Sequence, residues 1–279
     1  RGATDGYHRA MVNAATCESK LMPEARLQTR MKHAHTRYVN QYAHAAYIID
    51  AIGDALLERL SFIKLKPQRI LDLGSGLGYL SRSLAKRYPD ADIIALDFTH
   101  PMSQAAKGAC AAEPRIKILT ADAYHLPLAT HSVDLLVANL LLPALLDYPS
   151  LWLECQRVLV PGGLLMFSNL GPDTLLELRE SFADAHPHVN TFMDLHDVGD
   201  GLLEIAFMDP VLDNEYFHLS YPSLKALLQE LKALGSIKFI DDNAPYYLGK
   251  SAWAAVEHTY QQQFSDAKQR LIVTVEAYF

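Results

Sequence analysis

Short apolar runs alternate with amphipathic segments through the middle of the chain. Five runs read as buried strands, at 70–73, 93–97, 116–119, 133–138 and 164–168. Helical spacing follows the first run at Leu80, Leu84 and Tyr88, and helical patterns recur at 102–112 and 151–159. Apolar strands that alternate with helices predict an α/β fold, a mostly parallel sheet with helices on both faces. Ligands of such sheets bind beyond the carboxyl ends of the strands.

The segments on either side of this region follow other patterns. Apolar residues between 42 and 60 recur every three or four positions, which predicts a helix within 30–60. Beyond 169 we expect helices at 174–182, 197–207, 223–234 and 252–264 and strands at 211–219 and 271–278. Asp194 is the expected N-cap of the second of these helices. The extra helices are expected to form a lid together with the N-terminal helix.

Three alternate glycines follow the first strand. A dinucleotide fingerprint would need a third glycine at position 79, where this chain has Tyr79. Asp72, Gly74, Gly76 and Gly78 instead form D-x-G-x-G-x-G, which resembles motif I of the class I S-adenosylmethionine-dependent methyltransferases. Glycines at these positions allow the backbone to pass close to a ligand.

Acidic residues end three successive strands beside this turn. Asp97 is placed to accept hydrogen bonds from ribose hydroxyls, although an aspartate there can also cap the next turn. Asp122 resembles the methyltransferase acid that accepts from the adenine amino group. Together with Asp72 they favour S-adenosylmethionine over a phosphate-bearing cofactor, which three carboxylates would repel. The predicted cofactor-binding residues are Asp72, Gly74, Ser75, Gly76, Gly78, Asp97, Phe98, Met102, Asp122, Ala123, Asn139 and Leu140.

Two later stretches narrow the resemblance. The sequence L-G-P-D-T-L-L-E-L-R at 170–179 and H-D-V-G-D at 196–200 are similar to the malonyl-acyl-carrier-protein O-methyltransferase family over about 41–235. The resemblance implies a class I fold with a seven-stranded sheet and a helical lid. We expect an N-terminal extension and helical cap at 1–40 and a class I methyltransferase domain at 41–279, with lid insertions at about 171–195 and 220–268.

The same resemblance implies an activity, which is methyl transfer to the free carboxylate of a malonyl thioester in biotin biosynthesis. Malonyl-acyl carrier protein or malonyl-CoA would be the acceptor. A carboxyl group with a pKa of about 4 is ionised at neutral pH, so no general base is required. Tyr42 and Arg179 are the candidates for orienting the substrate; their structural alternatives are lid packing and an exposed surface position.

Acyl carrier protein is acidic, so its docking would need a local basic surface. Two clusters are candidates: Arg26, Arg30, Lys32 and Arg37, and Lys225, Lys232 and Lys238.

Composition excludes several other classes of function. A net charge of −7 over 279 residues gives no basic field for nucleic acid. No apolar run is long enough to span a membrane, and no signal-peptide layout begins the chain. The odd, widely spaced cysteines are typical of thiols in a reducing compartment, which favours a cytoplasmic location. Three cysteines and twelve histidines show no disulfide framework or metal-ligand set, so no metal is expected.

Two alternatives remain open. One is a methyltransferase acting on another small molecule, and the other is a methyltransferase-like assembly or binding protein without turnover. Leu142 and Pro143 stand where the family commonly has a Gln-Trp pair, which leaves room for the second alternative.

Overall fold

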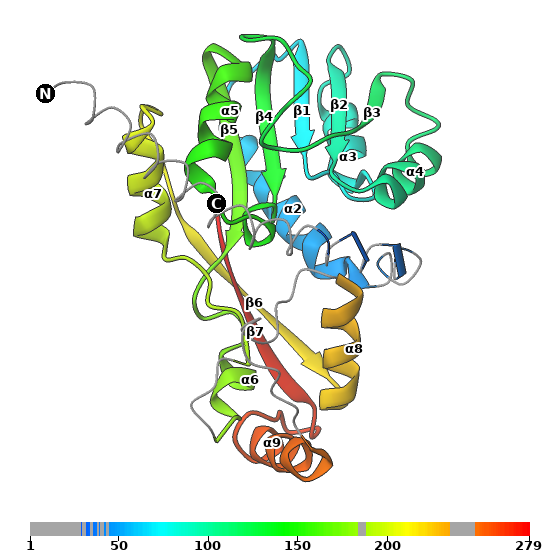
Figure 1. Ribbon diagram of the computed structural model, residues 1–279, viewed down its shortest axis with the longest axis vertical. Helices are drawn as coiled ribbons and strands as arrows, with labels where there is room; N and C mark the ends of the chain where they lie inside the picture. Colours follow the sequence, from blue (N-terminus) through cyan, green and yellow to red (C-terminus); the bar gives the residue numbers. More distant parts are fainter. Residues whose placement is uncertain are drawn as a thin grey trace, which may run out of the picture.

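The protein is described by a computed structural model that covers residues 29, 32, 33, 36, 37, 39, 42, 45–183, 188–234 and 249–279. Seven strands form one sheet in the order β3-β2-β1-β4-β5-β7-β6 (Figure 1). They are β1 (Arg69–Leu73), β2 (Asp92–Asp97), β3 (Ile116–Thr120), β4 (Val133–Asn139), β5 (Leu159–Leu170), β6 (Asn214–Tyr221) and β7 (Leu271–Tyr278). The first five are parallel, and β7 pairs antiparallel with both β5 and β6. This confirms the expected mostly parallel, seven-stranded class I methyltransferase sheet.

The helices of the described residues cover both faces of this sheet. They are α2 (Tyr47–Leu60), α3 (Tyr79–Arg87), α4 (His100–Ala109), α5 (Tyr148–Val158), α6 (Leu176–Glu180), α7 (Leu195–Glu204), α8 (Leu224–Leu234) and α9 (Lys250–Gln263), with a short 3₁₀ turn at Leu142–Ala144. One hydrophobic core joins the sheet to α2 and α3, and a second joins it to α5 and α7. Consecutive residues of β1 enter opposite cores, because successive side chains of a strand point to opposite faces.

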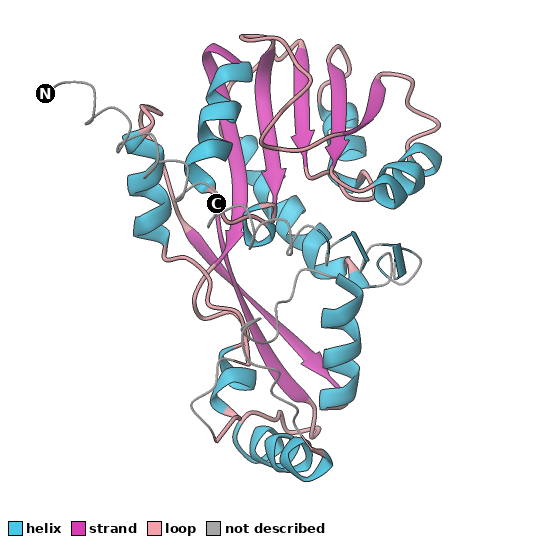
Figure 2. Cartoon of the chain, in the orientation of Figure 1, coloured by secondary structure: helices cyan, strands magenta, loops and turns pink. Residues whose placement is uncertain are grey.

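β6 and β7 form a long antiparallel ribbon that continues past the parallel strands (Figure 2). All eight residues of β6 pair with β7, whereas β5 reaches β7 only at Asn169 and Leu170. α8 lies alongside the ribbon, and α6 and α9 lie near its far end (Figure 1). The ribbon therefore carries the later helices beyond the carboxyl end of β5.

Most predicted elements are present, with shifted ends. Asp194 is the N-cap of α7 and accepts a hydrogen bond from the His196 N–H at 2.8 Å, as expected. The fifth strand is longer than expected, because the turn at 161–163 is contained within β5 as a register irregularity against β4. The predicted helix at 174–182 is reduced to α6, because Leu175 takes a left-handed φ of 59° just before it. Most of the N-terminal segment 30–46 lies outside the described residues.

The G-P-D-T segment before α6 is held against β7 by hydrogen bonds. Gly171 N–H donates to the Glu276 carbonyl at 2.9 Å, and Asp173 N–H donates to the Glu276 carboxylate at 3.0 Å. A Cβ on Gly171 would lie 2.3 Å from that carboxylate, so a side chain cannot be accommodated there without a shift. Thr174 Oγ1 lies 3.1 Å from the Glu276 carbonyl and accepts from the Glu276 N–H at 3.2 Å. The glycine and threonine of this segment therefore have a structural function.

Replacing Glu276 with alanine is expected to lower the free energy of unfolding by about 3 kcal/mol. The Glu276 side chain is 3% exposed and also accepts from Asn214 Nδ2 at 3.2 Å and, at 3.1 Å, from the Tyr216 hydroxyl. Removing the carboxylate would leave the Asp173 N–H and Asn214 Nδ2 without this acceptor, whereas the Tyr216 hydroxyl can still donate to the Asp173 carboxylate at 3.1 Å. Urea denaturation measures the effect, with Glu58→Ala on the exposed side of α2 as the control. If Glu276→Ala and Glu58→Ala lost equal amounts of unfolding free energy, the structural role of Glu276 would be contradicted.

Candidate functional site

The glycine turn between β1 and α3 has the backbone conformation that its sequence predicts. Gly74, Gly76 and Gly78 have φ angles of 80°, 51° and 74°. The Gly74 and Ser75 N–H groups donate to the Leu96 carbonyl at 2.8 and 2.9 Å, which holds the turn across the end of β2. Left-handed φ angles favour glycine at all three positions.

Gly78 has a second reason to be glycine. A Cβ built at this position would lie 2.7 Å from Cys110 Sγ at the end of α4. Gly78 is not among the residues that line the cavity described below. Close packing of α3 against Cys110 therefore accounts for this glycine.

Asp97 ties the glycine turn to the end of β2. Its Oδ2 accepts from the Gly76 N–H at 3.1 Å, while Oδ1 accepts from the Thr99 N–H at 2.7 Å and from Thr99 Oγ1 at 2.9 Å. The carboxylate is 7% exposed and lies on the cavity wall. Asp97 thus caps the following turn, and the lone pairs not used in these bonds are available to a ligand.

Asp72 is a buried acid at the end of β1. Its side chain is 1% exposed and accepts a short hydrogen bond from Ser81 Oγ on α3. Burial raises the pKa of Asp72 to about 7, an effect that the Ser81 bond opposes and the Asp97 charge increases. Near neutral pH this carboxyl group therefore takes up or releases a proton readily.

Replacing Asp72 with asparagine is expected to reduce the pH dependence of stability. The folded pKa of about 7 lies above the ordinary value of 3.8, so the folded state binds the proton more tightly than the unfolded state. The stability that this bound proton contributes to the folded state is complete below about pH 4 and is lost as the pH rises through about 7. Relative to wild type, Asp72→Asn should gain stability steadily over this window, as measured by urea denaturation at several pH values. Asp92→Asn, at an exposed position, is the control. If the unfolding free energies of wild type and Asp72→Asn changed with pH in the same way, the raised pKa of Asp72 would be contradicted.

Asn139 joins α2 to the ends of β4 and β5. Its Nδ2 donates to the Ile49 carbonyl at 2.9 Å, and its Oδ1 accepts from Ser168 Oγ at 2.6 Å. The Leu140 N–H donates to Ser168 Oγ at 3.0 Å, so this backbone donor is already used. Both Asn139 and Leu140 line the cavity.

A cavity of about 320 Å³ opens over the carboxyl ends of the strands. Nine of the twelve predicted cofactor-binding residues line it, namely Asp72, Gly74, Ser75, Gly76, Asp97, Phe98, Met102, Asn139 and Leu140. Tyr42 also lines it, and its hydroxyl lies 3.6 Å from a Cβ built on Gly76. Burial, followed by the Asp97 and Asp50 charges, raises the pKa of Tyr42, so the hydroxyl stays protonated. The structure therefore brings most of the predicted site together, with Tyr42 at the glycine turn.

Three other predicted residues are placed elsewhere. Asp122 accepts from the Tyr124 N–H at 3.0 Å and Ala123 packs in the core on the α5 side; neither lines the cavity. Arg179 also lies outside the lining residues and donates to the Pro172 carbonyl at 2.7 Å. The basic residue that does line the described cavity is Arg82 on α3, which sequence reasoning missed.

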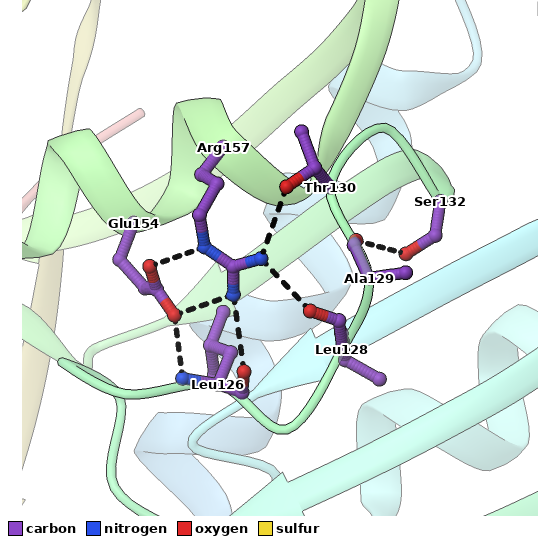
Figure 3. A network of polar contacts seen from close by, with 7 residues as sticks. All are labelled: Leu126, Leu128, Ala129, Thr130, Ser132, Glu154 and Arg157. Atoms are coloured by element: carbon purple, nitrogen blue, oxygen red, sulfur yellow. Dashed lines mark hydrogen bonds and ion pairs between the residues drawn. The ribbon is translucent and has the colours of Figure 1, made fainter.

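The loop between β3 and β4, which begins beside Asp122, is held at its far side by α5 (Figure 3). The Arg157 guanidinium donates to the carbonyls of Leu126 and Leu128 at 3.0 and 2.9 Å and pairs with Glu154 at 2.7 Å. Glu154 in turn accepts from the Leu126 N–H at 2.6 Å. Hydrogen bonding to Arg157 lowers the pKa of Glu154, so the pair stays charged and the loop stays anchored.

The other half of the cavity comes from the late part of the chain. It is lined mainly by apolar residues of β5, β6, β7 and α8, among them Leu170, Leu219, Leu227, Leu231, Val273 and Val275. Sequence periodicity identified these residues only as core or lid, because apolar residues on a cavity wall and in a core follow the same pattern.

The cofactor end of the cavity fits S-adenosylmethionine. Ser75 Oγ is the buried side-chain polar atom that lacks a hydrogen-bond partner within the described part of the chain, and it lies in the glycine turn on the cavity wall. A buried polar atom without a protein partner is available to donate a hydrogen bond to a ligand group or to accept one from it. Within the described ranges, no three His, Cys, Asp or Glu side chains gather in a way that could hold a metal ion. No helix among these residues is long and apolar enough to cross a membrane.

Comparisons with known proteins agree with this geometry. Residues 71–167 match the family model described as "Methyltransferase domain". The crystal structure of the YcgJ protein from Bacillus subtilis superposes with a TM-score of 0.56 at 13% identity, over 81% of this chain and 95% of that one, which shows the shared fold.

Two curated relatives cover most of the chain. The malonyl-[acyl-carrier protein] O-methyltransferase of Gallionella capsiferriformans is 40% identical, over 85% of this chain and 85% of its own length. The malonyl-[acyl-carrier protein] O-methyltransferase 1 of Coxiella burnetii is 39% identical, over 84% of this chain and 80% of its own length. With 40% and 39% identity over most of the chain, the chain belongs to the malonyl-[acyl-carrier protein] O-methyltransferase family.

Proposed function

We propose that this protein methylates the free carboxylate of a malonyl group that acyl carrier protein holds as a thioester, a step of biotin biosynthesis. The observation that carries the proposal is the continuous cavity, which joins the glycine turn to an apolar half lined by β6, β7 and α8. The relatives named above carry the same activity in their names over most of this chain.

The residues of the cofactor end have proposed roles. When bound, S-adenosylmethionine supplies an electrophilic methyl group on a sulfonium ion. Asp97 would accept from the ribose hydroxyls, and Ser75 would bind the amino-acid part beside Gly74 and Gly76. Tyr42 would cover the glycine turn and exclude water. Asp122, Ala123 and Gly78 remain predictions as direct cofactor contacts.

The acceptor needs no base from the protein. A malonyl carboxylate has a pKa of about 4 and is already ionised at neutral pH, so the chain has only to orient it and keep water out. The apolar walls from β6, β7 and α8 would exclude water from the acceptor. Arg179 remains a prediction for orienting the carboxylate.

Cys110 and Cys155 are buried free thiols, which supports a reducing, cytoplasmic location.

The test is intact-mass analysis of malonyl-loaded acyl carrier protein after incubation with S-adenosylmethionine and the protein. We expect a gain of one methyl group on the malonyl carrier and none on an unloaded carrier. Malonyl-CoA in parallel decides whether the carrier or the smaller thioester is preferred. Cofactor binding without methylation of any malonyl thioester would refute the proposal and favour another acceptor or a protein without turnover.

A further inference from the structure

The apolar half of the cavity contains one acid that the cofactor site does not use. Glu230 lies on α8 between Leu227 and Leu231, and all three line the cavity. Within the described ranges no Lys, Arg or His forms an ion pair with it. A carboxylate among apolar side chains, with no ion pair to it from the described residues, favours a ligand that can donate a hydrogen bond to it.

Two tyrosines hold this carboxylate in place. The Tyr221 hydroxyl donates to Glu230 Oε1 at 2.5 Å, and the Tyr47 hydroxyl lies 2.8 Å from the Tyr221 oxygen. Tyr221 has a single proton and gives it to Glu230, so Tyr47 must be the donor of the second bond. Burial, followed by hydrogen bonding to Glu230, raises the pKa of Tyr221, so this donor remains protonated. The arrangement leaves Glu230 Oε2 as a fixed acceptor.

The charge of Glu230 restricts what the apolar half can bind. A second carboxylate would be repelled in an environment of low dielectric constant, whereas a neutral amide N–H would gain a charge-assisted hydrogen bond. An acyl carrier protein presents its acyl group on a thioester at the end of a flexible arm that contains two neutral amides. The arm combines apolar methylene groups with N–H donors, which matches the Leu-rich wall and the Glu230 acceptor.

We infer, on the basis of the proposed function, that the half of the cavity between α8 and the β6–β7 ribbon binds the neutral, amide-containing arm of the thioester. Glu230 accepts a hydrogen bond from an amide N–H of this arm. Its negative charge also disfavours a second carboxylate in this half of the cavity.

The first experiment measures binding of S-methylpantetheine, a neutral copy of the arm, by calorimetry in the presence of saturating S-adenosylhomocysteine. Glu230→Leu should weaken this binding about tenfold, because the charge-assisted hydrogen bond is lost. Gln229→Leu, at the neighbouring exposed position of α8, is the matched control and should bind as wild type does. Affinity for S-adenosylhomocysteine should stay within twofold in both variants, which separates a local effect from misfolding.

The second experiment tests the charge of Glu230 directly. Pantothenate carries a carboxylate on the same type of chain, and wild type should bind it about tenfold more weakly than S-methylpantetheine. Glu230→Gln keeps an acceptor but removes the charge, so it should largely abolish this difference. Failure of wild type to bind S-methylpantetheine, or an unchanged difference in Glu230→Gln, would overturn the inference. Methyl transfer to the malonyl carrier is measured separately, so the proposed function can hold even if this inference fails.

Discussion

Replacing Asp97 with asparagine is expected to weaken binding of S-adenosylmethionine about 100-fold. The carboxylate accepts one hydrogen bond from the Gly76 N–H and two from Thr99. An amide group would place an NH₂ against one of these donors, so the turn would lose its present geometry. Two charge-assisted bonds to ribose hydroxyls would weaken at the same time, and together these losses give the expected size of the effect.

Calorimetric titration with S-adenosylmethionine would measure this change. Asp92→Asn, at the exposed start of the same strand, is the matched control and should bind the cofactor as wild type does. A titration of Asp97→Asn within threefold of wild type would show that this acid only caps its own turn.

Gly78→Ala is expected to lower the free energy of unfolding by about 3 kcal/mol, as much as Glu276→Ala. A left-handed φ of 74° costs a residue with a Cβ about 1–2 kcal/mol. The same Cβ would lie 2.7 Å from Cys110 Sγ, and overpacking of this kind adds about 1–3 kcal/mol. α3 would have to move away from α4 to relieve the contact.

A double-mutant cycle separates the two costs. Cys110→Ala removes the sulfur, so the double variant should recover the packing part and keep the backbone part. Gly108→Ala is the control, because a Cβ at that helical position meets nothing within 4 Å and should leave stability unchanged or raise it slightly. If Gly78→Ala is as stable as wild type, the close packing described above is wrong.

The cofactor half of the molecule could be predicted from sequence because its signals are local. Each parallel strand is a continuous apolar run, and each acid at a strand end follows its own run directly. The glycine turn adds a backbone requirement that shows in the residue types themselves. These local patterns were sufficient to place nine cofactor-binding candidates on one cavity wall.

The remaining features depend on contacts between distant parts of the chain. Glu276 bonds to Asp173, more than 100 residues earlier, and no local pattern marks either residue. The same holds for Glu177 and Thr274, whose side chains bond across α6 and β7. Arg179 was singled out because it belongs to a motif, but its guanidinium bonds to a nearby carbonyl. Motif membership alone therefore does not tell whether a residue lines the cavity, and the role of Arg179 stays a prediction.

The position of β7 in the sheet has a consequence for how the protein is made. β7 is the last of the seven strands along the chain, yet it lies between β5 and β6. On a ribosome, β1 to β5 can pair as they emerge, whereas β6 has no partner until β7 follows about 50 residues later. The acceptor half of the cavity would then form after the cofactor half. During that interval the apolar faces of β6 and α8 lack their packing partners and are exposed to solvent.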